Sequence, residues 1–348
     1  MASARVLDGA RGGGSVLRVG LGLAIALQHP IRVINIRQGR PNPGLQAQHL
    51  ASLRAAAQLC QARVEGAYLG SREIEFHPGP IQIDLLKVQI ETAGSVALAL
   101  QPIQIALARC TRPVTIEIIG GGTYVQWAPP IAALEHVTFA LLSRWGVPGH
   151  LEVEREGFYP KGGARVRAHF GPAHISQSFD LSEQGRLREI RGLSLASHHL
   201  QKSRVAERQA EAARKLLSQE LPRVSLEIET RYAETLSPGS AVVLWADCEK
   251  TLLGGDALGE RGISAERVGE QAASALLAEL RSGATLDRHM ADQIIPFLAL
   301  FGGRFLCAEL TDHVKTNIWV AEQITGRRFT VAERAGIWEI HCVVPWSI

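Results

Sequence analysis

The sequence predicts an α/β (α+β) fold in which three βαβαββ repeats form a large domain and a small α/β domain is inserted between repeats two and three. Two observations predict it. Three times, a glycine- or polar-capped apolar helix is followed by a β-rich run, a second amphipathic helix and a hairpin. The β-rich runs begin at Ile31, Val114 and Arg304, so they are 83 and then 190 residues apart. The excess of 107 residues has the size of a small domain.

The large domain is expected to comprise residues 1–170 and 282–348, with repeats at 1–80, 81–170 and 282–348. Each hairpin is centred on glycine, and residues 153–155 alternate with the period of a strand. The elements are expected in this order: a helix from Gly14, a strand at Ile31–Arg37, a helix at Gly44–Cys60 and a hairpin at Arg63–His77; a helix from Gly94, a strand at Val114–Gly120, a helix at Pro130–Trp145 and a hairpin at His150–Phe170; a helix from Asp292, a strand at Arg304–Leu310, a helix at Asp312–Ile324 and a hairpin at Arg327–Val344.

The inserted α/β domain is expected at residues 171–281. Amphipathic helices are predicted at Lys202–Ser218 and Ser264–Arg281, and strands at Arg223–Thr230 and Ala241–Ala246. The glycines from Gly254 to Gly262 predict a loop, because glycine clusters usually interrupt regular elements.

Composition limits the possible classes of protein. The 348 residues are 46% apolar and 20% charged, which excludes intrinsic disorder as the dominant state. The net charge of +3 is compatible with an anionic partner, but is too small for a nucleic-acid coat protein. Five widely spaced cysteines without a CxxC pair favour a reducing, cytoplasmic compartment. No apolar run approaches eighteen residues, so no membrane span is expected.

Two glycine-rich segments are candidate anion sites. The run Arg11-Gly12-Gly13-Gly14-Ser15 opens a helix, where backbone N–H groups and the helix dipole favour an anion; a tight strand–helix turn explains the same glycines. Residues 36–44 place Arg37 and Arg40 on a loop stiffened by two prolines, which suits phosphate binding. A solvated loop is the alternative interpretation.

Three further segments could carry chemistry. The glycines at 120–122 and the prolines at 129–130 mark a junction that a base or anion could approach, or an ordinary turn. The segment Gly157–Gly163 combines exposed aromatics with Lys161, as RNA-binding surfaces do, although a packed hairpin turn fits equally. His313 begins the last helix beside Asp312, where a histidine is either a capping residue or an activated nucleophile.

These segments occur in an order that resembles the RNA 3′-terminal phosphate cyclases through essentially the whole chain. The resemblance rests on Ile-Arg-x-Gly-Arg at 36–40, Gln-His-Leu at 48–50, Ala-Pro-Pro at 128–130, Gly-Phe-Tyr-Pro-Lys-Gly-Gly at 157–163 and His-x-x-Thr-Asn at 313–317. It implies an ATP-dependent enzyme that converts an RNA 3′-terminal phosphate into a 2′,3′-cyclic phosphate, a ligase-type nucleotidyl transfer through a covalent histidine–AMP and an RNA–adenylate.

The resemblance also implies roles for individual residues. His313 would be the nucleophile, and Arg18, Arg37 and Arg40 would neutralise phosphate charge. The nucleotide site would be completed by Gln48, His49, Gln101, Pro130, His289, Asp292 and Gln293. His289 stands where the family commonly has tyrosine. The expected partners are ATP and an RNA with a 3′-terminal phosphate.

The sequence departs from the family at the metal site. The family usually has a glutamate before the three glycines, which helps to hold a divalent cation, whereas this chain has Arg11. Like-charge repulsion at Arg11 should weaken Mg²⁺ or Mn²⁺ binding, which leaves Gln101 as a weak metal ligand. A non-catalytic RNA-processing or ribosome-assembly scaffold is the alternative function. Enolpyruvyl transferases use six such repeats and no insertion, for which this chain is too short.

Overall fold

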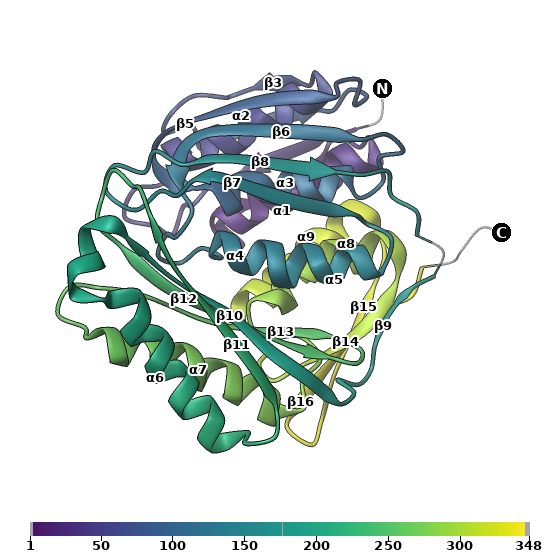
Figure 1. Cartoon of the computed structure of the whole chain (residues 1–348). Helices are drawn as coiled ribbons and strands as arrows, with labels where there is room; N and C mark the ends of the chain where they lie inside the picture. Colours follow the sequence, from purple (N-terminus) through teal and green to yellow (C-terminus); the bar gives the residue numbers. More distant parts are fainter. Residues whose placement is uncertain (1–2, 176, 345–348) are drawn as a thin grey trace.

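The computed structural model describes residues 3–175 and 177–344, and it has the mixed α+β fold that the sequence predicts. In Figure 1, helices of the second and third repeats lie between the sheets in the upper part of the molecule and the sheet in its lower part. Helix α1 (Gly14–Leu27) packs against α3 (Val96–Leu107) and α9 (Asp312–Thr325). Apart from Ser15 and Arg18, α1 consists of apolar residues and glycines; it is buried from Ser15 to Ile25, and its apolar residues belong to the main core.

The remaining elements of the three repeats follow in chain order. The first repeat contains β1 (Arg5–Asp8), η1 (Gly9–Arg11), β2 (Ile31–Ile34), α2 (Ala47–Cys60), β3 (Arg63–Glu65) and β4 (Ile74–His77). The second contains β5 (Leu85–Ser95), β6 (Val114–Gly122), a continuous helix formed by α4 (Ile131–Ala133), the π-helical η2 (Leu134–Phe139) and α5 (Ala140–Arg144), and then β7 (Gly149–Arg155) and β8 (Arg165–Phe170). The third contains β9 (Phe179–Leu181), α8 (Met290–Phe301), β14 (Gly303–Cys307), β15 (Phe329–Arg334) and β16 (Ile337–Cys342).

One strand order recurs in these sheets. The orders are β1-β2-β4-β3, β5-β6-β8-β7 and β9-β14-β16-β15. In each, the first two strands are parallel and the other neighbours are antiparallel. Strand β9 lies within the segment 171–281 that the sequence assigns to the insertion, yet it pairs with β14. The chain therefore starts the third sheet before it enters the elements of the insertion. The domain limits themselves stay a prediction.

The inserted elements form a sheet with its own helical layer. The sheet has the order β11-β10-β12-β13, with β10 (Leu187–Ser197), β11 (Ser225–Ala233), β12 (Ser240–Cys248) and β13 (Leu252–Leu258). Helices α6 (Val205–Glu220) and α7 (Ala265–Ser282) pack on it around a second apolar core, and η3 (His198–Ser203) precedes α6. Figure 1 shows these two helices on the outer side of the sheet. On the inner side, His136 of η2 stacks on Trp245 of β12 with ring centroids 4.2 Å apart.

Three expectations about local structure are wrong. Gly254 and Gly255 belong to strand β13 and not to a loop, because a Cβ on Gly255 would lie 2.5 Å from the backbone nitrogen of Leu276 on α7. Glycine here permits close packing of strand and helix. The strand expected at Ile31–Arg37 ends at Ile34, since Asn35 and Arg37 adopt left-handed backbone conformations. The strand expected at Arg304–Leu310 likewise ends three residues early, at Cys307. Among the described residues, no helix is both long and apolar enough to cross a membrane.

Candidate active site

His313 lies in the first turn of α9. The helix begins at Asp312 because Thr311 Oγ1 accepts a hydrogen bond of 3.2 Å from the N–H of Val314 and caps the helix. This cap fixes where the side chain of His313 leaves the helix. The ring lines two cavities at once, one of about 440 Å³ and one of about 580 Å³. We call the smaller one the arginine cavity and the larger one the large cavity.

The arginine cavity joins the start of α1, the loop after β2 and the start of α9. Its lining comprises Gly9, Ala10, Arg11, Gly12, Gly13, Arg37, Gly39, Arg40, Asp312, His313 and Thr316. The guanidinium of Arg37 is held in place because Nη1 donates to the carbonyls of Asn42 at 2.6 Å and Gly44 at 3.2 Å. Arg40 is exposed on the same loop. The arrangement offers positive charge to an anion beside the imidazole of His313.

Close contact between the N-terminal glycines and α9 shapes this cavity. A Cβ on Gly12 would lie 2.2 Å from Cγ2 of Thr316, so only glycine lets the two segments approach. Thr316 Oγ1 donates to the carbonyl oxygen of Arg11 at 3.3 Å. The side chain of Arg11 turns to α9, where its guanidinium carbon lies 4.9 Å from the ring centroid of Trp319. A cation–π contact therefore holds Arg11 against α9.

The large cavity lies between the helices of the repeats and the inserted sheet. Six residues expected at the nucleotide site line it: Arg18, Gln101, Pro130, His289, Asp292 and Gln293. Arg18 Nε donates to Gln101 Oε1 at 2.7 Å, which joins α1 to α3. Gln293 Nε2 donates to the carbonyl of His289 at 3.1 Å, which fixes the start of α8.

Burial changes the acid–base properties of the large cavity. It lowers the pKa of Arg18 to about 10, against the opposing attraction of Asp292, so this guanidinium stays charged at neutral pH. It raises the pKa of Asp292 to about 7, although His289 and Arg18 favour the carboxylate. Asp292 therefore exchanges its proton close to neutrality.

The two histidines near these arginines are held neutral. Burial, Arg18 and Arg40 lower the pKa of His313, with Asp312 opposing them. Burial, Arg18 and Arg37 lower the pKa of His49 to about 3. His49 Nδ1 accepts a hydrogen bond of 3.3 Å from the N–H of Gln46, so the proton of the neutral ring is on Nε2. A neutral His313 has a free lone pair on its imidazole, as a nucleophile requires.

A buried amide connects α9 with its neighbours. Asn317 lies one turn after His313; its Oδ1 accepts from Ser15 Oγ of α1, and its Nδ2 donates to the carbonyl of Asp292 on α8 at 2.8 Å. These bonds fix the position of the helix that carries His313. In the sequence, Asn317 could have been noticed as the last residue of the His-x-x-Thr-Asn motif that begins at His313.

The structure brings most expected residues together, but not all of them. His49 lies beside the start of α1, since a Cβ on Gly14 would be 2.5 Å from His49 Nε2 and 2.8 Å from Arg18 Nη1. Neither His49 nor Gln48 is among the described residues that line the two cavities. Gln48 instead lies beside Gly94, since a Cβ on Gly94 would be 3.6 Å from the Cβ of Gln48.

The sequence did not point to the contribution of the insertion. Asp256 of β13 lines the large cavity, and burial raises its pKa to about 6, assisted by Asp287 and opposed by His289. Asp287 Oδ2 accepts from the N–H of Gly254 at 2.8 Å, and Oδ1 accepts from the N–H of His289 at 2.9 Å. The carboxyl of Asp287 thus joins the inserted sheet to α8. In the sequence, the feature that could have indicated this contribution is Asp256, which directly follows Gly254 and Gly255.

Comparison with known proteins identifies relatives of this chain. Residues 10–331 match the family model described as RNA 3′-terminal phosphate cyclase. The chain is 42% identical over 332 residues to the RNA 3′-terminal phosphate cyclase of Thermococcus kodakarensis, covering 95% of each protein. It is 41% identical over 333 residues to that of Pyrococcus furiosus, covering 95% of this chain and 96% of the relative. It is 42% identical over 337 residues to that of Methanosarcina barkeri, covering 96% and 98%.

Proposed function

The chain belongs to the RNA 3′-terminal phosphate cyclase family, and from this premise we propose that it uses ATP to convert an RNA 3′-terminal phosphate into a 2′,3′-cyclic phosphate. The observation that carries the proposal is that His313 lines both the arginine cavity and the large cavity. A nucleophile at the wall of both spaces can reach the α-phosphorus of a nucleotide that extends from one into the other.

In the first proposed step, the lone pair of the His313 imidazole forms a bond to the α-phosphorus of ATP. The bond from that phosphorus to the bridging oxygen breaks, and pyrophosphate leaves. The lowered pKa of His313 supports this step, because a protonated ring has no lone pair to give. Arg37 and Arg40 would stabilise the charge that develops on pyrophosphate, and Arg18 the charge near the α-phosphate.

In the second proposed step, an oxygen of the RNA 3′-phosphate bonds to the phosphorus of the histidine-linked AMP, and the phosphorus–nitrogen bond breaks. In the third, the neighbouring 2′-oxygen bonds to the 3′-phosphorus, its proton passes to water, and AMP leaves. Adenylation is needed because a phosphate monoester dianion has no good leaving group of its own. Pro130, His289, Asp292 and Gln293 would hold the adenosine in the large cavity.

The residues present do not fit a divalent cation held by the protein beside Arg11. Asp312, the one carboxylate among the described residues of the arginine cavity, lies 3.4 Å from Lys315 Nζ. Gln101 Oε1 already accepts from Arg18, whose charge opposes a second cation. Mg²⁺ or Mn²⁺ with Gln101 as a weak ligand stays a prediction, and none of the three steps above depends on it.

A reducing, cytoplasmic location is also proposed. Cys60, Cys248, Cys307 and Cys342 are buried, and burial raises the pKa of each thiol. A raised thiol pKa disfavours the reactive thiolate. The alternative function, a non-catalytic scaffold, is not favoured, because such a protein has no use for a neutral histidine between two cavities.

The test is incubation of the full-length protein with ATP labelled at the α-phosphate, with Mg²⁺ or Mn²⁺ added. We expect a protein-bound label that is stable in base and labile in acid, as a phosphoramidate is. His313→Ala should remove the label, whereas His174→Ala, on the exposed linker after β8, should keep it. A wild-type protein that stays unlabelled with both metals would favour the scaffold function. A labelled protein should then convert a 3′-phosphorylated RNA to the cyclic product.

A further inference from the structure

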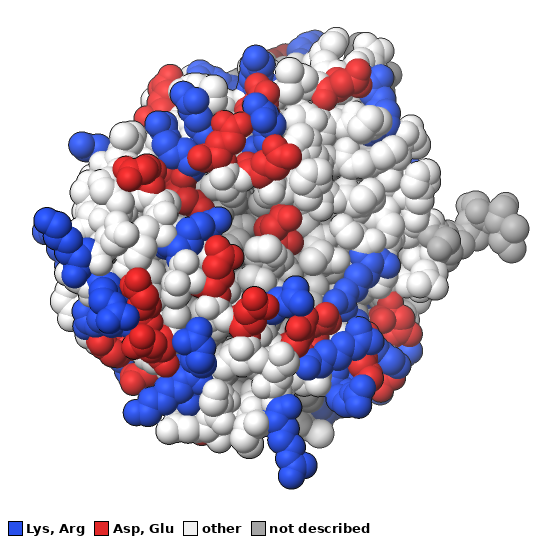
Figure 2. Space-filling view, in the orientation of Figure 1, with Lys and Arg blue, Asp and Glu red and all other residues white. Residues whose placement is uncertain are grey.

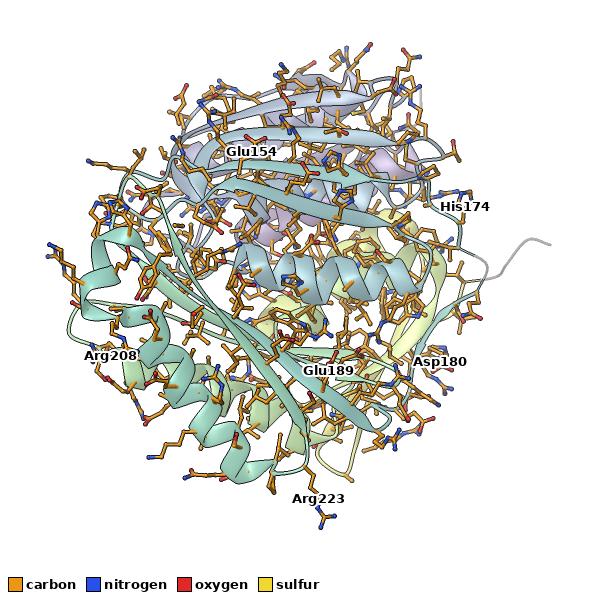
Figure 3. The ribbon with its side chains drawn as sticks, in the orientation of Figure 1. Glu154, His174, Asp180, Glu189, Arg208 and Arg223 are labelled. Carbon is orange, nitrogen blue, oxygen red and sulfur yellow. The ribbon has the colours of Figure 1, made fainter. Side chains whose placement is uncertain are left out.

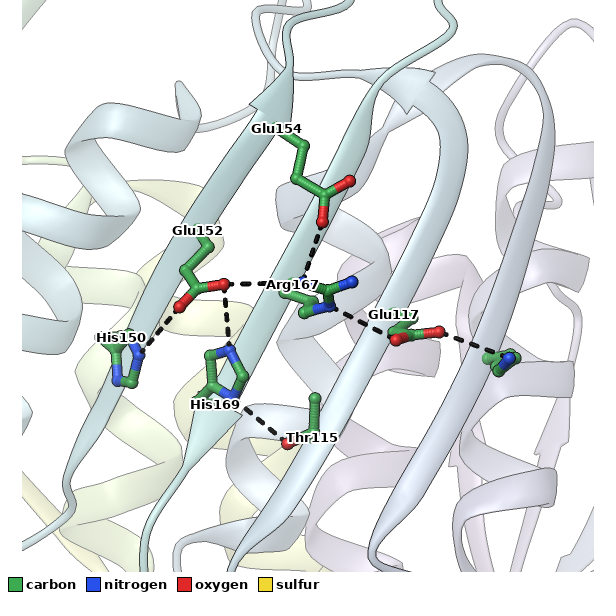
Figure 4. A network of polar contacts seen from close by, with 8 residues as sticks. Thr115, Glu117, His150, Glu152, Glu154, Arg167 and His169 are labelled. Atoms are coloured by element: carbon green, nitrogen blue, oxygen red, sulfur yellow. Dashed lines mark hydrogen bonds and ion pairs between the residues drawn. The ribbon is translucent and has the colours of Figure 1, made fainter.

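Two histidines face each other on the outer surface of the sheet β5-β6-β8-β7. His150 of β7 and His169 of β8 are cross-strand partners, and Thr115 of β6 is the partner of His169 on the other side. Glu152 follows His150 by two residues, so its side chain is on the same face of β7. The register of three strands therefore places two imidazoles, one carboxylate and one hydroxyl in adjacent positions (Figure 4).

The ligating atoms of this cluster converge. One atom each from His150, Glu152 and His169 forms a set in which all lie within 4.8 Å of one another. His169 Nε2 is 3.6 Å from Glu152 Oε2, and His150 Nε2 is 3.9 Å from Glu152 Oε1. His169 Nε2 is shielded from solvent and has no hydrogen-bond partner among the described residues. An imidazole nitrogen that is buried without a partner is a suitable lone-pair donor to a metal ion.

A neighbouring hydroxyl orients one of the rings. Thr115 Oγ1 lies 3.2 Å from His169 Nδ1, so the remaining nitrogen, Nε2, is directed toward Glu152. Hydrogen bonds of this kind fix the tautomer of a metal-binding histidine. The two imidazole rings are stacked with centroids 4.6 Å apart and an angle of 20° between their planes. Figure 4 shows both rings beside the carboxylate of Glu152.

We propose that His150, His169 and Glu152 form a Zn²⁺ site. A set of two imidazoles and one carboxylate binds zinc in preference to magnesium or calcium, which favour oxygen ligands. The fourth position of the zinc tetrahedron is left for water. Zinc–ligand bonds of about 2 Å place tetrahedral ligands roughly 3.3 Å apart. The observed separations of 3.6 and 3.9 Å are longer than this, so the side chains need to move closer together when the ion binds. None of the three residues lines the arginine cavity or the large cavity.

The surrounding charges are compatible with a bound cation. Arg167 is the nearest positive group, with Nη1 3.8 Å from Glu152 Oε2, but it also pairs with Glu154 at 3.0 Å and with Glu117 at 3.3 Å. Lys87 pairs with the other oxygen of Glu117 at 3.6 Å. Three carboxylates thus face two cations, and Figure 2 shows acidic and basic side chains side by side over the upper part of this face. Zinc would connect edge strand β7 to β8.

The test is a zinc titration of the full-length protein after treatment with a chelator, followed by calorimetry. We expect one Zn²⁺ per chain in the tightest class of sites, and a higher melting temperature with Zn²⁺ than without it. His150→Gln, His169→Gln and Glu152→Gln should each remove this class of sites and its effect on melting. Thr115→Val should weaken binding by about 10-fold, since it removes only the orienting hydroxyl. Arg167→Gln should strengthen binding, because it removes a competing cation.

His174→Ala is the matched control. Figure 3 shows His174 at the edge of the molecule. Its side chain is exposed and does not belong to the converging set of His150, Glu152 and His169, so this variant should bind zinc as the wild type does. Co²⁺ gives a second measurement: a tetrahedral absorption band should appear in the wild type and disappear in the three ligand variants. The proposal is wrong if zinc binds less than one equivalent, or if the glutamine variants bind it with unchanged affinity while remaining folded by circular dichroism.

Discussion

The guanidinium of Arg18 and the amide of Gln101 hold each other at the wall of the large cavity, through a hydrogen bond of 2.7 Å from Nε to Oε1. One side chain comes from α1 and the other from α3, 83 residues later. The bond leaves the two terminal nitrogens of the guanidinium for an anionic ligand, while it occupies the oxygen that a metal ion would need. It thus favours phosphate over a cation at this position.

Arg18→Gln is expected to reduce the rate of His313 adenylylation by about 10²–10³-fold, because a buried charge that stabilises the transition state is lost. Rapid quenching of the reaction with α-labelled ATP measures this rate. The control is Arg32→Gln on β2, where an exposed arginine pairs with Glu73 at 2.6 Å. If the adenylylation rate of Arg18→Gln equals that of the control, Arg18 does not contact the phosphate groups as proposed.

Arg11→Glu is expected to lower the concentration of Mg²⁺ or Mn²⁺ needed for half-maximal adenylylation. It replaces a cation at the arginine cavity with a carboxylate, whose oxygens are ligands that Mg²⁺ prefers. Arg11→Gln is the control, since it also removes the contact with Trp319 but supplies no carboxylate. An identical metal dependence for the two variants would indicate that the cation is held by other groups.

Asp292 should make the protein less stable as the pH rises from about 4 to about 7. The pKa of this carboxyl is raised to about 7 by burial, so the folded state keeps a proton that the unfolded state has lost. Above pH 7 both states are ionised, and the buried charge costs up to about 4 kcal/mol of unfolding free energy. Urea unfolding at several pH values should show a flatter pH dependence for Asp292→Asn.

Asp180→Asn provides the comparison for this pH series. A hydrogen bond from Arg304 lowers the pKa of the Asp180 carboxyl. The ionised Asp180 therefore adds to the free energy of unfolding at neutral pH, and this addition is lost on acidification. Removing Asp180 should therefore leave the decrease in stability between pH 4 and 7 in place. Equal curves for wild type and Asp292→Asn would mean that Asp292 is ionised in the folded protein well below pH 7.

Asn317→Ala is expected to destabilise the fold by about 2–4 kcal/mol and to slow adenylylation. It leaves the hydroxyl of Ser15 and the carbonyl of Asp292 without partners in a buried region. Thermal unfolding gives the stability, and the rate is measured well below the melting temperature. Ser52→Ala removes another buried side-chain bond, to the carbonyl of Gln48 on the same helix, and should leave the rate unchanged. Equal rates for both variants would show that Asn317 does not position His313.

The sequence determined the local elements and the residue types of the candidate site. Periodicity and glycines located α1, α3, α9 and the three hairpins to within a few residues, because these signals depend on neighbours along the chain. The pattern of motifs predicted Arg18, Arg37, Arg40 and His313 as site residues, and their roles stay a prediction. Strand β13 was missed because its glycines serve the packing against α7, which no local pattern reports.

Only the tertiary structure decided which of these residues meet. Packing of α9 against the glycines before α1 brings His313 to a loop about 270 residues earlier in the chain. The same packing turns Arg11 toward Trp319, and Asp256 enters the large cavity from the inserted sheet. Strand register places His150 opposite His169. Such contacts depend on how complete elements pack against each other, so the sequence supplies the side chains while the fold sets the distances between them.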